Sequence, residues 1–223
     1  MAAVADQKGV QQVIFLGKAG SGKGTQAKRV AERFGIPHIS TGDILREAVK
    51  NETELGRRAA PIMAAGELVP DDLMIGIIRE RLQQPDAAAG FILDGFPRTV
   101  AQAEKLDEML AGNGNESLKV LHLSVPDEMI IRRIVARRSC SSCGAIYHLE
   151  NSPPAKEGVC DRCGGALIAR ADDREEVVRP RLESFQRQTM PVVEHYRRKN
   201  LLQEIDGQLS ADGVFEEIEK SLN

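Results

Sequence analysis

Two short stretches of the chain hold the residues best suited to chemistry. The first is GKAGSGKGT, from Gly17 to Thr25, and the second contains two Cys-x-x-Cys pairs with sixteen residues between them. Glycine-rich loops bind phosphate groups through backbone N–H groups, and paired cysteines bind metal ions. Together they fit the transfer of a phosphoryl group between two nucleotides, a reaction that must exclude water.

The first stretch has the spacing of a phosphate-binding loop: glycine, four residues, glycine, lysine. Its glycines let successive N–H groups point at an anion, and the helix expected after it adds a positive partial charge. Lys23 can bridge the terminal phosphates of a nucleotide. Gly24 stands where a hydroxyl usually binds magnesium, and Thr25 comes one residue later, so metal binding by the loop itself stays open.

A dinucleotide-binding loop is the alternative for the same stretch. Gly22, Gly24 and Ala27 fit the spacing of that motif, and Asp43 follows them by about twenty residues. We favour the phosphate-binding loop, because the dinucleotide motif gives Lys23 no role.

The cysteine pairs predict a structural zinc site with four thiolate ligands: Cys140, Cys143, Cys160 and Cys163. Few apolar residues surround them, so a metal would replace a hydrophobic core. Iron also fits tetrahedral sulfur, and the sequence does not decide between the two metals. A redox pair or a nucleic-acid-binding ribbon is less favoured, because the setting is not thioredoxin-like and few basic or aromatic residues separate the pairs. The neighbouring His148 is expected to pack or form hydrogen bonds rather than bind metal.

Composition limits the class of protein. The chain has 223 residues, 42% hydrophobic residues and a net charge of −3, which fits one α/β domain with insertions or two small domains. This charge does not favour binding to nucleic acid or to an anionic membrane. The sequence contains no run of eighteen apolar residues, so it predicts no membrane span, and its N-terminus does not resemble a secretory signal. With all the cysteines in one cluster, we expect a cytoplasmic protein.

Apolar runs and helical patterns alternate along the chain. Strands are expected at Val13–Leu16, Phe91–Leu93, Val120–Val125 and Leu201–Ile205, and helices at Gln26–Phe34, Asp71–Gln83, Val100–Ala111 and Val214–Leu222. Residues 175–199 are also helical in pattern, with Pro180 awkwardly placed and Pro191 beginning a new helix. Such alternation predicts a parallel sheet covered by helices on both faces.

Two segments interrupt the alternation. Thr41–Val69 is helical, polar and rich in alanine, and Ala136–Asp173 is rich in cysteine, glycine, proline and serine. Both are predicted to project from the carboxyl edge of the sheet, where such folds bind ligands. Asp94 ends a predicted strand at that edge, where it could hold a magnesium ion through water. The histidines His38, His122 and His195 are expected to be structural.

Three further motifs make a family resemblance specific: ISTGDILR at residues 39–46, GELVP at 66–70 and FILDGFPRT at 91–99. From about Val13 to Leu209 the chain resembles the adenylate kinases, in particular the bacterial type with a long zinc-bearing lid. The resemblance implies a P-loop fold in three layers, with a parallel sheet between helices. Its implied parts are a core of residues 1–39, 70–135 and 174–223, a helical insertion for the nucleoside monophosphate at 40–69, and a zinc-binding lid at 136–173.

The resemblance also implies roles for individual residues. ATP would contact Gly20, Ser21, Gly22, Lys23, Gly24, Thr25, Arg133, Arg137, Ile146, Tyr147 and Leu209. AMP would contact Thr41, Arg46, Glu67, Leu68, Val69, Gly95, Phe96, Pro97, Arg98, Gln102, Arg170 and Arg181. The catalytic groups would be Lys23, Asp94, Arg98, Arg137, Arg170 and Arg181, which align the phosphates and neutralise their charge.

The implied reaction is the reversible transfer of a phosphoryl group from ATP to AMP, giving two ADP, with Mg²⁺ as cofactor, structural Zn²⁺ in the lid, and no covalent intermediate. The implied partners are ATP, AMP and ADP, and the implied state is a monomer. Two positions depart from the family: Ala19 replaces a proline of the loop, and Ala136 replaces a glycine at the lid hinge. A kinase for another monophosphate, a donor preference for GTP, and a nucleotide-dependent switch remain as alternatives.

Overall fold

The computed structural model describes residues 12–111 and 118–223. Within these ranges, five parallel strands form a central sheet in the order β2-β3-β1-β4-β8. The strands are β1 (Gln12–Leu16), β2 (His38–Ser40), β3 (Phe91–Asp94), β4 (Leu118–Ser124) and β8 (Leu202–Asp206). The predicted parallel sheet is therefore confirmed. Residues 1–11 of the predicted core lie outside the described ranges.

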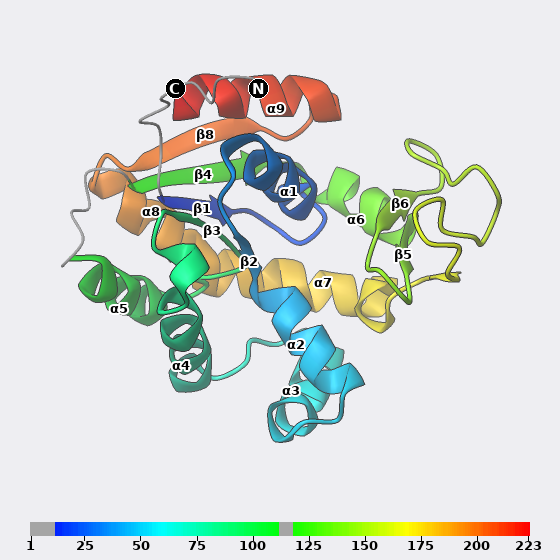
Figure 1. Cartoon of the computed structure of the whole chain (residues 1–223), viewed down its shortest axis with the longest axis horizontal. Coiled ribbons are helices and arrows are strands. Elements are labelled where there is room, and N and C mark those ends of the chain that lie inside the picture. The colour runs from blue at the N-terminus through cyan, green and yellow to red at the C-terminus, as the bar shows by residue number, and fades with distance from the viewer. Residues whose placement is uncertain (1–11, 112–117) are drawn as a thin grey trace.

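Helices cover both faces of this sheet (Figure 1). One face packs against α1 (Lys23–Phe34) and α9 (Ala211–Leu222). The other face packs against α4 (Asp71–Leu82), α5 (Val100–Leu110) and α8 (Met190–Arg198). The three-layer arrangement expected from the sequence is thus present.

Strand β1 shows why its sequence is a continuous apolar run. Val13 and Phe15 pack on the α1 and α9 side, whereas Ile14 and Leu16 pack on the opposite side. All four side chains are almost fully buried. Side chains alternate between the faces of a strand, so a strand with helices on both sides is apolar at every position.

Two segments project from the sheet, on either side of α7 (Glu175–Ser184) (Figure 1). One contains α2 (Thr41–Lys50) and α3 (Glu54–Ala64). The other, which we call the lid, contains a small antiparallel sheet of β5 (Arg137–Cys140), β6 (Ile146–His148) and β7 (Leu167–Ile168). The lid follows α6 (Asp127–Val135), which packs against α7 through Ile130, Ile134 and Val178.

Some elements were not predicted from the sequence. Strand β2 has only three residues, too few to show a periodic pattern. Helix α6 has acidic residues in its first turn and two buried isoleucines one turn apart, which could have revealed it. Within the helical run at 175–199, five residues, Phe185–Thr189, form a π-helix. Pro180 lies inside α7, in the awkward position that the sequence indicated. Pro191 is in the first turn of α8, which agrees with the expected start of a new helix.

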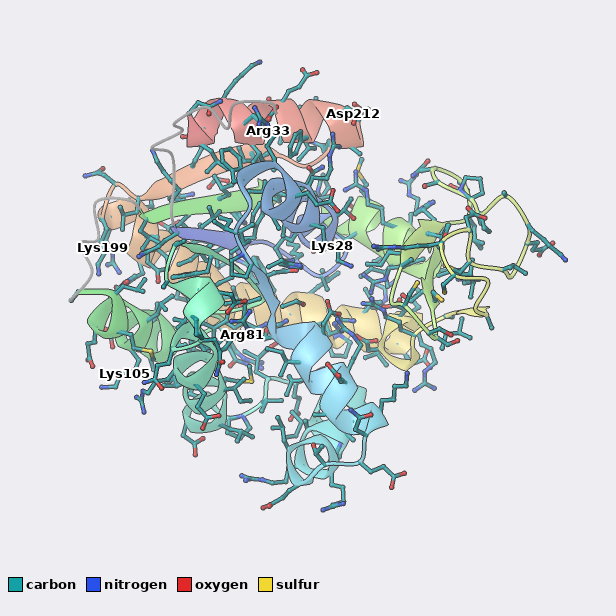
Figure 2. All side chains as sticks on the ribbon, viewed as in Figure 1. Lys28, Arg33, Arg81, Lys105, Lys199 and Asp212 are labelled. Carbon is teal, nitrogen blue, oxygen red and sulfur yellow. The ribbon has the colours of Figure 1, made fainter. Side chains whose placement is uncertain are left out.

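Charged side chains cover the outer faces of the helices (Figure 2). Arg33 bonds to Glu219 and Arg29 to Asp212, which ties α1 to α9. Throughout the part of the chain that the structure describes, no helix is both long and apolar enough to cross a membrane.

Candidate active site

The glycine-rich loop lies between β1 and α1. Helix α1 begins at Lys23, and its N-cap is Gly22, which has no side chain to satisfy the first N–H groups of the helix. Those groups are therefore available to an anion. Gly20 has φ of +82°, and an added Cβ would lie 2.6 Å from Cγ1 of Ile134. The loop can thus pack this closely on α6 only with glycine at that position.

Lys23 is held beneath the loop. Its Nζ donates to the carbonyl oxygens of Gly17, at 2.7 Å, and Lys18, at 2.8 Å. Desolvation is the main reason that the pKa of Lys23 is lowered to about 8; the charge of Asp94 opposes this shift, and the charge of the nearby Arg98 guanidinium adds to it. An anion bound in front of the loop would stabilise the charged form of this lysine.

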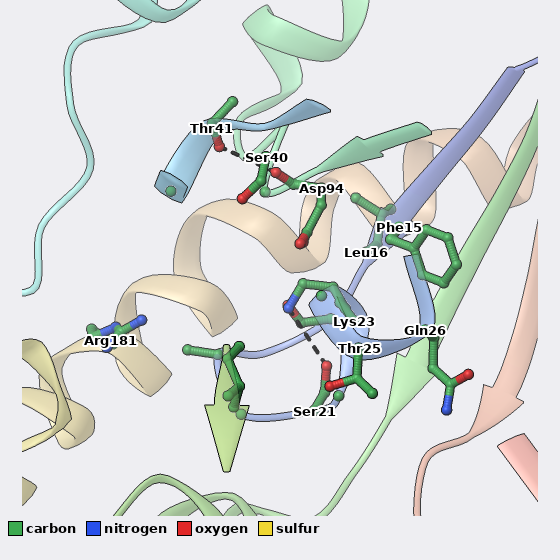
Figure 3. A pocket seen from close by; sticks show the side chains of 18 of the residues that line it. Phe15, Leu16, Ser21, Lys23, Thr25, Gln26, Ser40, Thr41, Asp94 and Arg181 are labelled. Atoms are coloured by element: carbon green, nitrogen blue, oxygen red, sulfur yellow. Dashed lines mark hydrogen bonds between the residues drawn. The ribbon is translucent and has the colours of Figure 1, made fainter. Parts of the chain in front are cut away.

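Asp94 lies at the carboxyl end of β3 and faces the same space as Lys23 (Figure 3). Its Oδ2 is 3.3 Å from Nε2 of His38. Burial alone would raise the pKa of Asp94, but the hydrogen bond with His38 and the charge of Lys23 hold it below its ordinary value. An added Cβ on Gly24 would lie 3.2 Å from Asp94 Oδ2. A larger residue after Lys23 would therefore require the Asp94 carboxylate to move by a few tenths of an ångström.

Three arginines are fixed by contacts at the two ends of the lid: Arg137 and Arg170 within it, and Arg181 in α7. Arg137 donates through Nε to Oδ2 of Asp173 at 2.8 Å and makes a second ion pair with the same carboxylate. Nη1 of Arg181 donates to the backbone oxygen of Asp172 at 2.7 Å. Arg170 donates through Nε to Oγ of Ser139 at 2.7 Å. These contacts hold the guanidinium groups in place before any ligand binds, which reduces the entropy lost on binding.

Arg98 follows the turn after β3. Its Nε donates to the carbonyl oxygen of Gly95 at 2.8 Å, and its backbone N–H donates to Oε1 of Gln102 at 2.7 Å. Gln102 in turn donates to Asp71 at 2.7 Å. Burial, and then repulsion from Arg181, lower the pKa of Arg98 to about 10.

The pKa of Arg170 is lowered in the same way as that of Arg98. Burial and the charge of Arg46 lower its pKa to about 10. The site therefore concentrates positive charge at an electrostatic cost that an anionic ligand would relieve.

These residues surround one cavity of about 810 Å³. Every predicted ATP-binding and catalytic residue lines it, and so does every predicted AMP-binding residue except one. The exception is Phe96, which is buried in the main hydrophobic core. The structure thus brings together residues from α1, the α2–α3 segment, the turn after β3 and the lid.

Several lining residues were not identified as site residues from the sequence. His38, expected to be structural, lines the cavity and contacts Asp94. Ser40 and Thr189 also line it; Ser40 caps α2 by accepting from the N–H of Asp43, and Thr189 donates to the carbonyl oxygen of Arg98 at 3.0 Å. The position of Ser40 directly before a helix start was an available signal, whereas Thr189 lies in the π-helix and gave none.

The other histidines behave as expected. His122 contacts Glu204 and His195 contacts Asp107, both at 2.8 Å, and neither histidine lines the cavity. His148 accepts hydrogen bonds from the N–H groups of Glu150 and Asn151 within the lid, as expected, although it also lines the cavity.

The four lid cysteines form a metal-binding cluster. Their Sγ atoms all lie within 4.8 Å of one another, with 3.5 Å between Cys140 and Cys163 and 3.6 Å between Cys143 and Cys160. None of the four is in a disulfide. Tetrahedral zinc with Zn–S bonds of about 2.3 Å needs sulfurs about 3.8 Å apart, so the cluster fits zinc. The hydrogen bond with the Tyr147 hydroxyl holds the pKa of the Cys160 thiol below its ordinary value.

Comparison with known proteins identifies the family. A sequence model described as adenylate kinase matches residues 15–201. The chain belongs to the adenylate kinase family. An adenylate kinase of Archaeoglobus fulgidus is 54% identical over 210 residues, which cover 94% of this chain and 97% of that protein. Adenylate kinases of Caldicellulosiruptor saccharolyticus and a Geobacillus species are 53% and 50% identical, and each alignment covers at least 94% of this chain and 97% of the relative.

Family membership makes the protein a phosphotransferase that converts ATP and AMP to two ADP, as the resemblance implied. The four-cysteine cluster agrees with the adenylate kinases that have a long zinc-binding lid. Because the relatives cover nearly the whole chain, the α2–α3 segment and the lid both belong to the part that is shared.

Proposed function

We propose that the protein catalyses reversible, magnesium-dependent, in-line phosphoryl transfer from ATP to AMP beneath a closed lid, without a covalent enzyme intermediate. The observation that carries this mechanism is the gathering of cationic side chains around one cavity, among them Lys23, Arg46, Arg98, Arg137, Arg170 and Arg181. The cavity extends from the glycine-rich loop to the α2–α3 segment, which supports two anionic substrates facing each other.

We assign the donor nucleotide to the loop side of the cavity. The loop N–H groups and Lys23 hold the ATP phosphates, Arg133 and Arg137 approach from the lid hinge, and Ile146, Tyr147 and Leu209 contact the base and ribose. Ile146 and Leu209 support this assignment, because they are 39% exposed apolar side chains at the cavity wall. A planar base would cover such surface from water.

We assign AMP to the opposite side of the cavity. Arg46 and Arg98 contact its phosphate, Gln102 and the backbone of Glu67–Val69 contact its base, and Thr41 and Gly95–Pro97 complete the wall. Gln102 is supported in that role because its Oε1 and Nε2 are already oriented by Arg98 N–H and Asp71. For Phe96, whose side chain is in the core, we propose only that it holds the turn in shape.

Transfer between these sites requires alignment and charge neutralisation. ATP and AMP together bring about six negative charges close together. The attacking phosphate of AMP is already an anion, so no general base is required. The arginines fixed by Asp172, Asp173 and Ser139 are aimed before substrates bind, and fixed charges of this kind stabilise a transition state without reorganisation.

Magnesium is assigned to the region of Asp94, which would hold the ion through water. Hard cations prefer oxygen ligands, and the low pKa of Asp94 keeps its carboxylate charged. A magnesium ion bound there with ATP neutralises charge on the phosphates. Thr25 lines the same cavity one residue after the position usual for a magnesium ligand.

Lid closure is supported by a contact between the two projecting segments. Nζ of Lys50, at the end of α2, is 3.4 Å from the backbone oxygen of Ser141 in the lid. The two segments are therefore in contact with each other, and their closure would exclude the water that competes with AMP as the nucleophile. Adenylate kinases are themselves a known example of lid closure, so this step comes from the family as well as from the contact.

We also propose a division into three parts: a core of residues 1–39, 70–135 and 174–223, a monophosphate-binding insertion at 40–69, and a lid at 136–173. The proposal further includes a structural zinc ion in the lid, a monomeric state and a cytoplasmic location. The three hydrophobic clusters contain no residue between 136 and 173, which supports the lid as a separate unit. Four reduced cysteines support a reducing compartment.

The direct test is ADP formation by the purified zinc-loaded protein. We expect ADP from ATP and AMP when magnesium is present and none without it. CMP, UMP and GMP as acceptors, and GTP as donor, serve as comparisons. Faster turnover with one of these acceptors than with AMP would contradict the acceptor assignment, and a phosphorylated enzyme trapped without AMP would contradict direct transfer.

The lowered pKa of Lys23 predicts a pH dependence of ATP binding. With a pKa of about 8, roughly nine-tenths of Lys23 is charged at pH 7 and about one-tenth at pH 9. Bound phosphate favours the charged form, so its pKa rises and binding above pH 8 takes up a proton. We therefore expect the Kd for ATP to increase from pH 7 to pH 9, and calorimetry in buffers of different ionisation enthalpy to detect the proton.

The matched variant is Lys23→Arg, which stays charged throughout this range. Its Kd for ATP should change much less with pH, even where its affinity is lower. An equally steep increase in both proteins would assign the dependence to another group.

A further inference from the structure

Tyr147 lies between the cavity and the cysteine cluster. It is in β6, lines the cavity beside Ile146, and its hydroxyl oxygen is 3.5 Å from Sγ of Cys160. One side chain is therefore in contact with both the proposed ATP pocket and a metal ligand. Neither the residue roles proposed above nor the proposed zinc site implies a link between the ATP pocket and the cysteine cluster.

The hydrogen bonds of the Tyr147 hydroxyl indicate which atom is the donor in its contact with Cys160. The backbone N–H of Asp161 donates to the Tyr147 oxygen at 2.8 Å. The oxygen is thus an acceptor for Asp161, and its single proton is left to donate. The sulfur of Cys160 is the partner at hydrogen-bond distance, so Tyr147 donates to the thiolate.

The backbone connects the same two places. Tyr147 pairs with Arg138 across the β5–β6 ladder, and β5 ends at a second cysteine of the cluster, Cys140. Ser139, the residue before Cys140, accepts the hydrogen bond from Arg170. A shift of the cluster would therefore move both the Tyr147 ring and an arginine of the cavity.

We propose that Tyr147 couples the metal centre to the ATP pocket: its hydroxyl holds the Cys160 thiolate, and its ring is held by bound ATP. Groups that hydrogen-bond to metal ligands fix the orientation of those ligands, and removing such groups typically lowers metal affinity. Linkage is reciprocal, so ATP tightens zinc binding by the factor by which zinc tightens ATP binding. This inference rests on the proposed function, which places ATP against Tyr147.

Tyr147→Phe removes the hydroxyl and keeps the ring, and Tyr196→Phe is the matched control. Tyr196 is the other tyrosine of the chain and is fully buried in the main core. Zinc release from each holoenzyme without nucleotide is followed with a chromophoric chelator. We expect Tyr147→Phe to release zinc about tenfold faster than the wild type, and Tyr196→Phe to release it at the wild-type rate. Equal rates for all three proteins would overturn the proposal.

Cobalt(II) in place of zinc gives a readout that a loss of stability would not produce. A hydrogen bond to a thiolate lowers its electron-donating strength. Tyr147→Phe should therefore shift the sulfur-to-cobalt charge-transfer band to lower energy, whereas Tyr196→Phe should not. An unshifted band in Tyr147→Phe would show that the hydroxyl does not bond to a ligand sulfur.

The coupling itself is tested by adding ATP, with magnesium in excess so that the nucleotide does not bind the released zinc. We expect saturating ATP to slow zinc release from the wild type about fivefold or more, and to protect Tyr147→Phe less. If the protein forms ADP but ATP leaves zinc release unchanged, the coupling is wrong and the proposed function stands. If ATP neither binds nor gives ADP, the proposed function fails, and the effect of the hydroxyl without nucleotide is still measurable.

Discussion

Lys23→Met is expected to lower kcat/KM for ATP by roughly 10²–10³-fold, the size of effect seen when one preorganised charge donor is removed from an active site. Lys23 is the proposed phosphate-binding cation of the loop, and its ammonium group is already held at 2.7 Å and 2.8 Å from two loop carbonyl oxygens. Methionine keeps a similar length and removes the charge. Because the transferring phosphoryl group gains its stabilisation from such cations, we expect most of the loss in kcat.

The control is Lys105→Met. Lys105 is an exposed lysine of α5 that pairs with Glu108, outside the cavity (Figure 2). Its kcat/KM should stay within about twofold of the wild type, since exposed ion pairs contribute little. Both variants should keep the wild-type melting temperature within a few degrees. A normal kcat in Lys23→Met would show that Lys23 does not stabilise the transition state.

Much of the site could be predicted because its residues lie in contiguous motifs. GKAGSGKGT combines the loop after β1 with the first turn of α1, and FILDGFPRT combines a buried strand with the turn after it. In both, local sequence determines the backbone shape and most of the side chains that reach the cavity. The cysteine pairs are similarly local, and their spacing indicated the cluster before the structure placed its sulfurs together.

The remaining residues depend on packing between distant segments. His38 contacts Asp94 because β2 lies beside β3, with His38 paired to Ile92. Thr189 reaches the Arg98 carbonyl oxygen from a π-helix that no sequence pattern indicated. Phe96, in contrast, lies within a recognised motif but is directed into the core. A motif therefore identifies a turn, but not which of its side chains face the ligand.

The charges of the cavity connect the lid to the reaction. Arg137 and Arg170 depend on Asp173 and Ser139 for their positions, and β5 joins Arg137 and Ser139 to the first cysteine of the cluster. The lid contributes no residue to the three hydrophobic clusters, and Leu149 and Ile168 are 45% and 50% exposed. We therefore expect its order to depend on a metal bound at the cysteine cluster as well as on short backbone ladders.

Removal of the metal is accordingly expected to destabilise the lid, so that it opens locally and unfolds at a lower temperature, while the central sheet stays folded. A chelator should make the bonds between residues 141 and 166 sensitive to protease and lower the temperature of inactivation by roughly 10 °C. Loss of a structural metal destabilises by several kcal/mol, and each kcal/mol shifts the transition of a chain of this size by about 2–4 °C. Zinc should restore both properties, whereas magnesium, which prefers oxygen ligands, should restore neither.

Cys143→Ser should reproduce the metal-free protein, because it removes one thiolate ligand, whereas Ser142→Ala should behave as the wild type. Ser142 lies in the same turn and contacts Cys140 Sγ through its backbone N–H, which alanine keeps. Limited proteolysis with mass spectrometry locates the cleavage sites, and residual ADP formation after heating gives the inactivation temperature. Identical cleavage patterns with and without metal would mean that the lid folds through its strands alone, and the metal would then lose its structural role.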